Sequence, residues 1–134
     1  MKQLIDKLAW IYIKDRKVLS TRSKGKDVWY IPGGKREEGE SDHDALIREV
    51  KEELTVDLVP TTIKYLETFK AQAHGKPEGF LVQMTCYTSE FQGELTPSAE
   101  IAEMIWLDST ADQSLLAPVD IIIFDYLKKR DLID

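Results

Sequence analysis

Hydrophobic and polar residues follow two kinds of pattern along this chain of 134 residues, one typical of strands and one typical of helices. Stretches rich in β-branched and aromatic residues predict β-strands, and the polar stretches between them, containing Gly or Pro, predict loops. The predicted strands cover residues 7–14, 17–21, 28–31, 63–71, 80–88 and 104–107. Two further stretches, residues 42–54 and 118–129, have the period of an amphipathic helix. The pattern therefore predicts about six strands and two helices.

Both predicted helices begin at recognisable start signals. Ser41 is a favourable N-cap for the first, and Asp44 three residues later resembles a capping box. Pro118 suits the first turn of the second helix. Because the strands form hairpins without regular βαβ repeats, we expect an α/β fold: a mixed β-sheet between helices, or α/β/α sandwich. Residues 1–134 show no internal repeat or linker, so a single domain is expected.

The composition limits the classes of partner that this chain is expected to bind. The net charge of −6 argues against a basic nucleic-acid-binding surface, although a nucleotide remains an acceptable ligand where a metal reverses the local charge. Cys86 is the only cysteine, so no intrachain disulfide forms and a reducing, cytoplasmic setting is expected. No apolar run is long enough for a membrane span, and the first ten residues have no signal-peptide core. A homodimer is compatible with the sequence.

The helix predicted over residues 42–54 has two faces. Its apolar stripe is formed by residues 46, 47, 50 and 54, because successive helical residues turn by about 100°. Glu49, Glu52 and Glu53 lie beside this stripe, and their mutual repulsion would be relieved by a divalent cation. Carboxylate oxygens favour Mg²⁺ or Mn²⁺ over Zn²⁺. The alternative interpretation is an ordinary solvated face of a helix.

The surrounding positions favour the metal site. Eight residues resemble, in identity and spacing, the signature of the Nudix hydrolases, G-x5-E-x7-R-E-U-x-E-E-x-G-U, in which U is bulky and apolar; this signature is called the Nudix box. The matching residues are Gly34, Glu40, Arg48, Glu49, Val50, Glu52, Glu53 and Val56. Thr55 stands where the family has glycine. The resemblance covers residues 34–56 and implies the Nudix fold and metal-dependent hydrolysis of a nucleoside diphosphate linked to another group, by water attack at phosphorus.

The resemblance also implies roles for the box residues. Glu49, Glu52 and Glu53 would bind the metal, the Gly33 carbonyl would add a ligand, and Glu40 would support the metal shell. Arg48 would orient the helix glutamates through a charge-assisted hydrogen bond. Its alternative role is an ordinary surface ion pair with Asp44 or Glu52.

The resemblance also implies one more glutamate, which Nudix enzymes often supply from a loop before a later strand as a metal ligand or general base. Glu100 and Glu103 are the candidates, and Glu100 is preferred because its spacing from Trp106 resembles the MutT-like branch. A solvated loop carboxylate is the alternative for either residue. The general base stays open among Glu49, Glu53 and Glu100.

Substrate contacts are less clearly marked. Arg22 and Lys35 are candidates to neutralise phosphate oxygens, although exposed basic residues are mostly solvating. Gly34 would let the backbone approach the ligand closely. Phe80 and Leu116 are candidates for the base pocket, with core packing as the alternative. The same choice, base stacking or core, applies to Trp29 and Tyr30.

The function expected from these features is that of a Nudix pyrophosphohydrolase. The small size favours a nucleoside triphosphate, cleaved to the monophosphate and pyrophosphate. An ADP-ribose or nucleotide-sugar hydrolase is the alternative enzyme. A Nudix-fold nucleotide sensor without turnover and a plain acidic interaction domain are the non-enzymatic alternatives.

Overall fold

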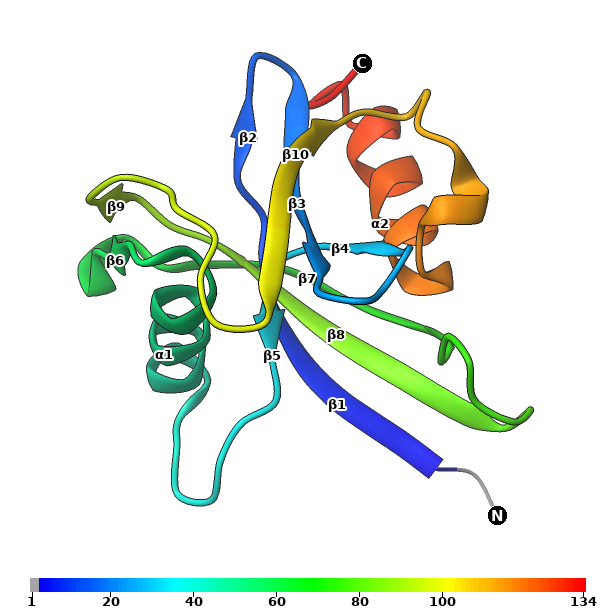
Figure 1. Ribbon diagram of the computed structural model, residues 1–134, viewed down its shortest axis with the longest axis horizontal. Coiled ribbons are helices and arrows are strands. Elements are labelled where there is room, and N and C mark those ends of the chain that lie inside the picture. Colours follow the sequence, from blue (N-terminus) through cyan, green and yellow to red (C-terminus); the bar gives the residue numbers. More distant parts are fainter. Residues whose placement is uncertain (1–2) are drawn as a thin grey trace.

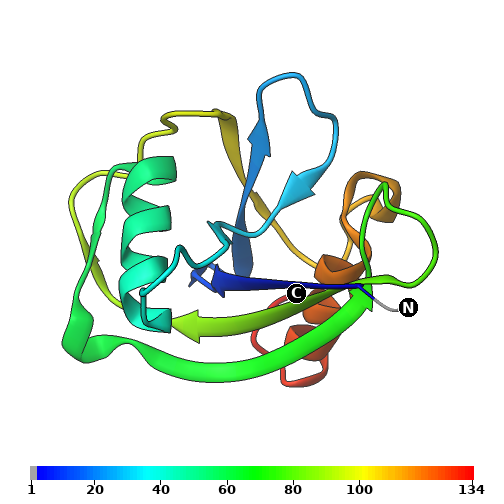
Figure 2. The ribbon, with the colours of Figure 1, turned by 90° about the horizontal axis from the view of Figure 1, so that it is seen from below.

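The computed structural model describes residues 3–134, and its strands form a mixed arrangement between two helices (Figures 1 and 2). Strands β1 (Gln3–Trp10), β5 (Gly33–Gly34), β7 (Lys64–Gln72) and β8 (Phe80–Thr88) form one sheet in the order β5-β1-β8-β7. Strands β1 and β8 are parallel, whereas the other two pairings are antiparallel. The predicted mixed sheet is therefore confirmed.

A second sheet has the order β10-β3-β2, formed by β2 (Ile13–Lys14), β3 (Lys17–Ser23) and β10 (Ile101–Leu107), and β4 (Trp29–Tyr30) also pairs with β3. A two-stranded ladder joins β6 (Asp57–Leu58) to β9 (Phe91–Gln92). Short 3₁₀ turns cover Pro60–Thr62 and Gln113–Leu115. No helix in residues 3–134 is long and apolar enough to cross a membrane.

Helices α1 (Asp42–Leu54) and α2 (Pro118–Lys129) lie on opposite sides of the strands (Figure 2). The period of two in β1 explains the two cores, because successive side chains point to opposite faces. Leu8 and Trp10 pack with the buried side of α1, while Ala9 and Ile11 pack with the buried side of α2. The α/β/α sandwich expected from the sequence is thus confirmed.

Several boundaries differ from the sequence prediction. The strand predicted over residues 7–14 begins at Gln3 and is interrupted after Trp10, and β10 begins at Ile101 instead of residue 104. The greatest difference concerns Gly33 and Gly34, which lie outside every predicted strand but form β5 on β1. Their low strand propensity concealed this pairing. The short strands β6 and β9 were missed because a two-residue ladder leaves no periodic pattern.

The first helix ends in a left-handed residue, as the family's glycine would, although Thr55 occupies the position. Thr55 has φ 63° and ψ 15°, and its N–H donates to the Lys51 carbonyl at 3.0 Å. A β-branched residue is strained in this conformation. The Thr55 hydroxyl donates to the Glu94 carbonyl at 3.3 Å, which ties the end of the helix to the following loop.

We expect Thr55→Gly to raise the free energy of unfolding by about 0.5–1 kcal/mol, because glycine adopts this conformation without strain. Thr55→Ala is the matched control, since alanine loses the hydroxyl and keeps the strain. Chemical denaturation of the three proteins measures the effect. A glycine variant no more stable than the alanine variant would contradict the strain at this cap.

The second helix is anchored to the strand region by a buried carboxylate. Asp120 is fully buried, and its Oδ2 accepts the backbone N–H of Ile31 at 3.0 Å. Its Oδ1 is buried without a hydrogen-bond partner in the described residues. Burial raises the pKa of Asp120 to about 7, although the Ile31 N–H and the charge of Lys7 oppose the shift. The anchor is therefore destabilising when ionised.

This carboxyl makes stability depend on pH. Between pH 3.8 and about 7 the folded Asp120 keeps a proton that the unfolded chain has released, so stability falls as pH rises through this window. Asp120→Asn keeps an acceptor for Ile31 and removes the charge. We expect its melting temperature, relative to the natural protein, to increase from pH 4 to pH 7 and reach roughly 3 °C or more at pH 8. A difference independent of pH would disprove this role for ionisation.

Candidate active site

The carboxylate cluster lies where β5 passes between β1 and α1. A Cβ on Gly33 would stand 2.0 Å from the Leu8 carbonyl oxygen, and the φ of Gly33 is +145°. A Cβ on Gly34 would meet the carboxylate of Glu49 at 2.5–2.8 Å. Only glycine therefore fits at position 33 against the backbone of β1, whereas a side chain at position 34 would require the Glu49 carboxylate to move.

Glu53 is the most buried of the helix glutamates. It is 7% exposed, and its Oε1 accepts the Gly33 N–H at 2.9 Å. Burial raises its pKa to about 8; the Gly33 N–H opposes this shift, and the charges of Glu49, Glu100 and Glu52 add to it. Burial likewise raises the pKa of Glu49, against the opposing effect of Arg48. The cluster therefore carries unfavourable negative charge.

Arg48 joins the loop to the helix. Its Nε and Nη2 donate to the two carboxylate oxygens of Glu40, each at 2.8 Å, and its Nη1 donates to Glu49 Oε1 at 3.0 Å. The Arg48 guanidinium lowers the pKa of Glu40 to about 2, assisted by the backbone N–H of Glu37. A longer contact of 3.4 Å reaches Glu52, whereas the alternative partner Asp44 has no ion pair with Arg48. Arg48 thus holds Glu40 and Glu49 in fixed positions.

Glu100 is brought to the cluster by a loop that packs on the end of α1. The N–H groups of Thr96 and Ser98 donate to the carbonyls of Leu54 and Glu53, at 3.0 and 2.9 Å. The Glu100 carbonyl accepts the Lys24 N–H at 2.7 Å, which fixes its backbone. Glu100 and Glu53 line one cavity of about 190 Å³. The other candidate, Glu103, instead forms an ion pair with Arg22 across β10 and β3.

Only some of the residues predicted to contact the substrate lie at this cavity. Gly34 lines this cavity, together with Tyr30. Arg22 also donates to the Lys26 carbonyl and lies over the Trp29 ring, while the side chain of Lys35 is exposed. Two further candidates, Leu116, which is 5% exposed, and Phe80, belong to the α2-side core and do not line the cavity.

Sequence reasoning missed Lys7, which lines the same cavity and also a second, mostly apolar cavity of about 130 Å³. Its neighbours on the same face of β1 are Ile5 and Ala9, both packed on the α2-side core. A charged residue between two inward-facing apolar residues was the available signal. The burial of Asp120 was not predicted, because the surrounding residues of the second helix have the pattern of an ordinary helix that packs on the core.

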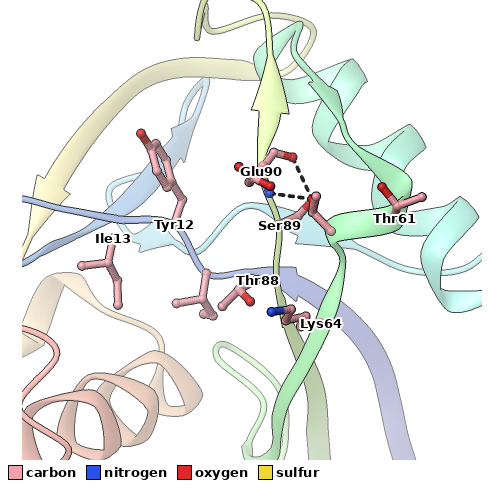
Figure 3. Close-up of a pocket in the computed structure, with 9 residues that line it drawn as sticks. Tyr12, Ile13, Thr61, Lys64, Thr88, Ser89 and Glu90 are labelled. Carbon is pink, nitrogen blue, oxygen red and sulfur yellow. Dashed lines mark hydrogen bonds between the residues drawn. The ribbon is translucent and has the colours of Figure 1, made fainter.

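A larger groove of about 600 Å³ lies elsewhere, between the residues shown in Figure 3. It contains Lys64, Glu90 and several hydroxyls, which partly bond to one another: the Thr62 and Ser89 hydroxyl oxygens are 3.2 Å apart. None of the predicted site residues lines it. Volume alone therefore does not identify the chemistry, which depends on the carboxylate cluster.

The donor set is chemically suited to a divalent cation. Burial raises the pKa of Glu49 and Glu53, and the negative charges of neighbouring glutamates add to both shifts, as expected for carboxylates that are incompletely neutralised. All these donors are hard oxygen ligands, which fit Mg²⁺ or Mn²⁺. Within residues 3–134 no group of three or more His, Cys, Asp or Glu side chains is already arranged around a common metal position. One reason is that Glu49 accepts a hydrogen bond from Arg48, which holds its carboxylate toward the guanidinium.

Comparison with known proteins identifies the family. The model of the NUDIX domain matches residues 7–120. The chain belongs to this family. An uncharacterised Nudix hydrolase of Bacillus subtilis is 30% identical over 116 residues, which cover 86% of this chain and 73% of that protein. The CTP pyrophosphohydrolase of Escherichia coli is 28% identical over 128 residues, covering 92% and 90%.

A further relative and a solved structure support the same family. An 8-oxo-dGTP diphosphatase of Proteus vulgaris is 35% identical over 68 residues, covering 51% of this chain and 56% of that protein. Among solved structures, the Escherichia coli ORF135 protein has a TM-score of 0.73 and 26% identity, covering 96% of this Nudix chain and 92% of its own. The fold prediction is confirmed, and the chain is a Nudix hydrolase acting on pyrophosphate bonds.

The two box glycines give separable predictions. Gly34→Ala should lower kcat/KM roughly tenfold to a hundredfold, because the new methyl group displaces the Glu49 carboxylate. Its melting temperature should change little, since a flexible side chain can move. Gly33→Ala meets backbone atoms and should destabilise the fold by about 2–3 kcal/mol. Steady-state kinetics and thermal melting of both variants measure this contrast, and equal losses of stability would contradict it.

Proposed function

We propose that this chain hydrolyses a nucleoside triphosphate to the monophosphate and pyrophosphate, with Mg²⁺ or Mn²⁺ as cofactor. The observation that supports this most is the junction of two cavities with different chemistry. One is lined by Glu53 and Glu100 beside the two box glycines, and the other is lined mainly by apolar side chains. Phosphates with a cation suit the first cavity, and a nucleobase suits the second.

Each site residue then has a task. Glu49, Glu52 and Glu53 hold the cation, with the Gly33 carbonyl as a further ligand. Arg48 positions Glu49 and anchors Glu40, in keeping with its hydrogen bonds. A divalent cation in this place supplies neutralising charge to the phosphate oxygens and makes water more acidic. Without that charge the carboxylates would repel the substrate.

The reaction itself is a displacement at phosphorus. An oxygen–phosphorus bond forms from water while the bond to the pyrophosphate leaving group breaks. Glu100 lines the cavity, and its side chain forms no hydrogen bond or ion pair with residues 3–134. These observations support Glu100 as the acceptor of the proton of the attacking water, because Glu53 already accepts the Gly33 N–H.

The nearly full-length similarity to a CTP pyrophosphohydrolase supports a triphosphate substrate. ADP-ribose, nucleotide sugars and dinucleoside polyphosphates are the competing classes. A screen of all four classes with Mg²⁺ or Mn²⁺, assayed by chromatographic separation of the nucleotide products, separates them, and release of pyrophosphate identifies cleavage of a triphosphate. Faster cleavage of ADP-ribose or a nucleotide sugar than of any triphosphate would overturn the proposed substrate. Tight binding without turnover would indicate a sensor.

Two glutamine substitutions separate metal binding from proton transfer. Glu53→Gln should weaken Mn²⁺ binding and reduce kcat by roughly a thousandfold, since it removes a cation ligand. Glu100→Gln should lower kcat by about a hundredfold, with a smaller effect on Mn²⁺ affinity. Chelation of the metal should abolish turnover in the natural protein, and added Mg²⁺ should restore it. Full activity of Glu53→Gln would show that the site is misassigned.

A further inference from the structure

Lys7 occupies the wall between the two cavities of the proposed site. It lines the cavity that contains Glu53 and Glu100, and it also lines the apolar cavity, as do Tyr30 and Met84. Its backbone is fixed in the middle of β1, paired with Met84 of β8. The ammonium group therefore extends from a rigid strand and not from a loop.

This lysine is half-buried and incompletely neutralised. It forms no ion pair and no side-chain hydrogen bond with residues 3–134. Burial and the nearby charge of Lys35 lower its pKa, and the carboxylates of Asp120, Glu53 and Glu49 only partly oppose this shift. A buried cation without a direct partner is costly, and an anionic ligand would relieve that cost.

The cations predicted from sequence are placed less favourably for the phosphates. Arg22 is committed to Glu103 and to the Lys26 carbonyl, and neither Arg22 nor Lys35 lines the cavity. Among the basic residues of the described chain, Lys7 alone lines the cavity of Glu53 and Glu100. The cation available for the substrate inside this cavity is therefore supplied by β1.

We propose that Lys7 binds the phosphate group adjoining the nucleoside of the substrate. This role rests on the proposed function, in which the carboxylate-lined cavity binds the phosphates and the apolar cavity binds the base. A residue at their junction meets the phosphate that joins the two parts. Its ammonium would donate a charge-assisted hydrogen bond to a non-bridging oxygen of that phosphate.

Lys7→Met tests this role, because methionine keeps the length and apolar part of the side chain and removes the charge. With the triphosphate that the natural protein cleaves fastest, KM should rise about tenfold or more, as expected for the loss of one charge-assisted hydrogen bond. Inhibition by the nucleoside monophosphate product should weaken more than inhibition by inorganic pyrophosphate. Lys7→Arg should recover part of the affinity.

Stability distinguishes binding from a structural role. Lys7→Met should melt at the same temperature as the natural protein or higher, since it removes an unpartnered buried charge. A purely structural counter-ion predicts the opposite: a lower melting temperature with unchanged inhibition by the monophosphate. Lys64→Met is the matched control, because Lys64 is an exposed lysine of β7 in the groove of Figure 3 and should alter neither property.

Different results would contradict the role of Lys7 and the proposed function. A natural protein that cleaves no triphosphate would contradict the function. Calorimetric titration with the common nucleoside monophosphates requires no turnover and still compares natural protein with Lys7→Met. Equal monophosphate affinity and equal KM in the two proteins would overturn the role of Lys7.

Discussion

The close passage of β5 between β1 and α1 is the constraint on which the site depends. A side chain at Gly33 would clash with the backbone of β1, and a side chain at Gly34 would displace the Glu49 carboxylate. The same strand supplies the N–H that binds Glu53. Sheet, helix and the carboxylate cluster therefore meet at one short segment, so a change in backbone position there alters the fold and the candidate site together.

Around that segment, charge is concentrated beyond what folding alone would favour. Burial and mutual repulsion raise the pKa of Glu49 and Glu53, while Arg48 compensates mainly Glu40 and part of Glu49. A cation removes this penalty, as does protonation. Lys7, which lines the same cavity as Glu53, is a half-buried ammonium that has no direct partner among residues 3–134. The arrangement stores unsatisfied charge of both signs, which suits a ligand that combines a metal ion with phosphates.

Long periodic segments were predicted well, and the reasons are local. Helices α1 and α2 and strand β8 have the predicted bounds, because their start signals and apolar periods lie within the segments themselves. Strand β5 was not predicted, since two glycines carry no strand signal and the pairing depends on β1. The choice between Glu100 and Glu103 also needed the structure: it depends on the register that places Glu103 opposite Arg22.

The family and the carboxylate face of α1 could be predicted from the sequence alone, because they follow from residue identity and spacing along one helix, and the sandwich architecture followed from the order of predicted strands and helices. The residues that share the cavity could be identified only from the folded structure. Lys7 lies 46 positions before Glu53 in the chain and Glu100 lies 47 positions after it, and both line its cavity. Strand pairing and loop packing bring them there, and no local pattern records such long-range contacts. Thr55 shows the same division: its identity marked an anomaly, and only its backbone angles showed that the left-handed cap is kept.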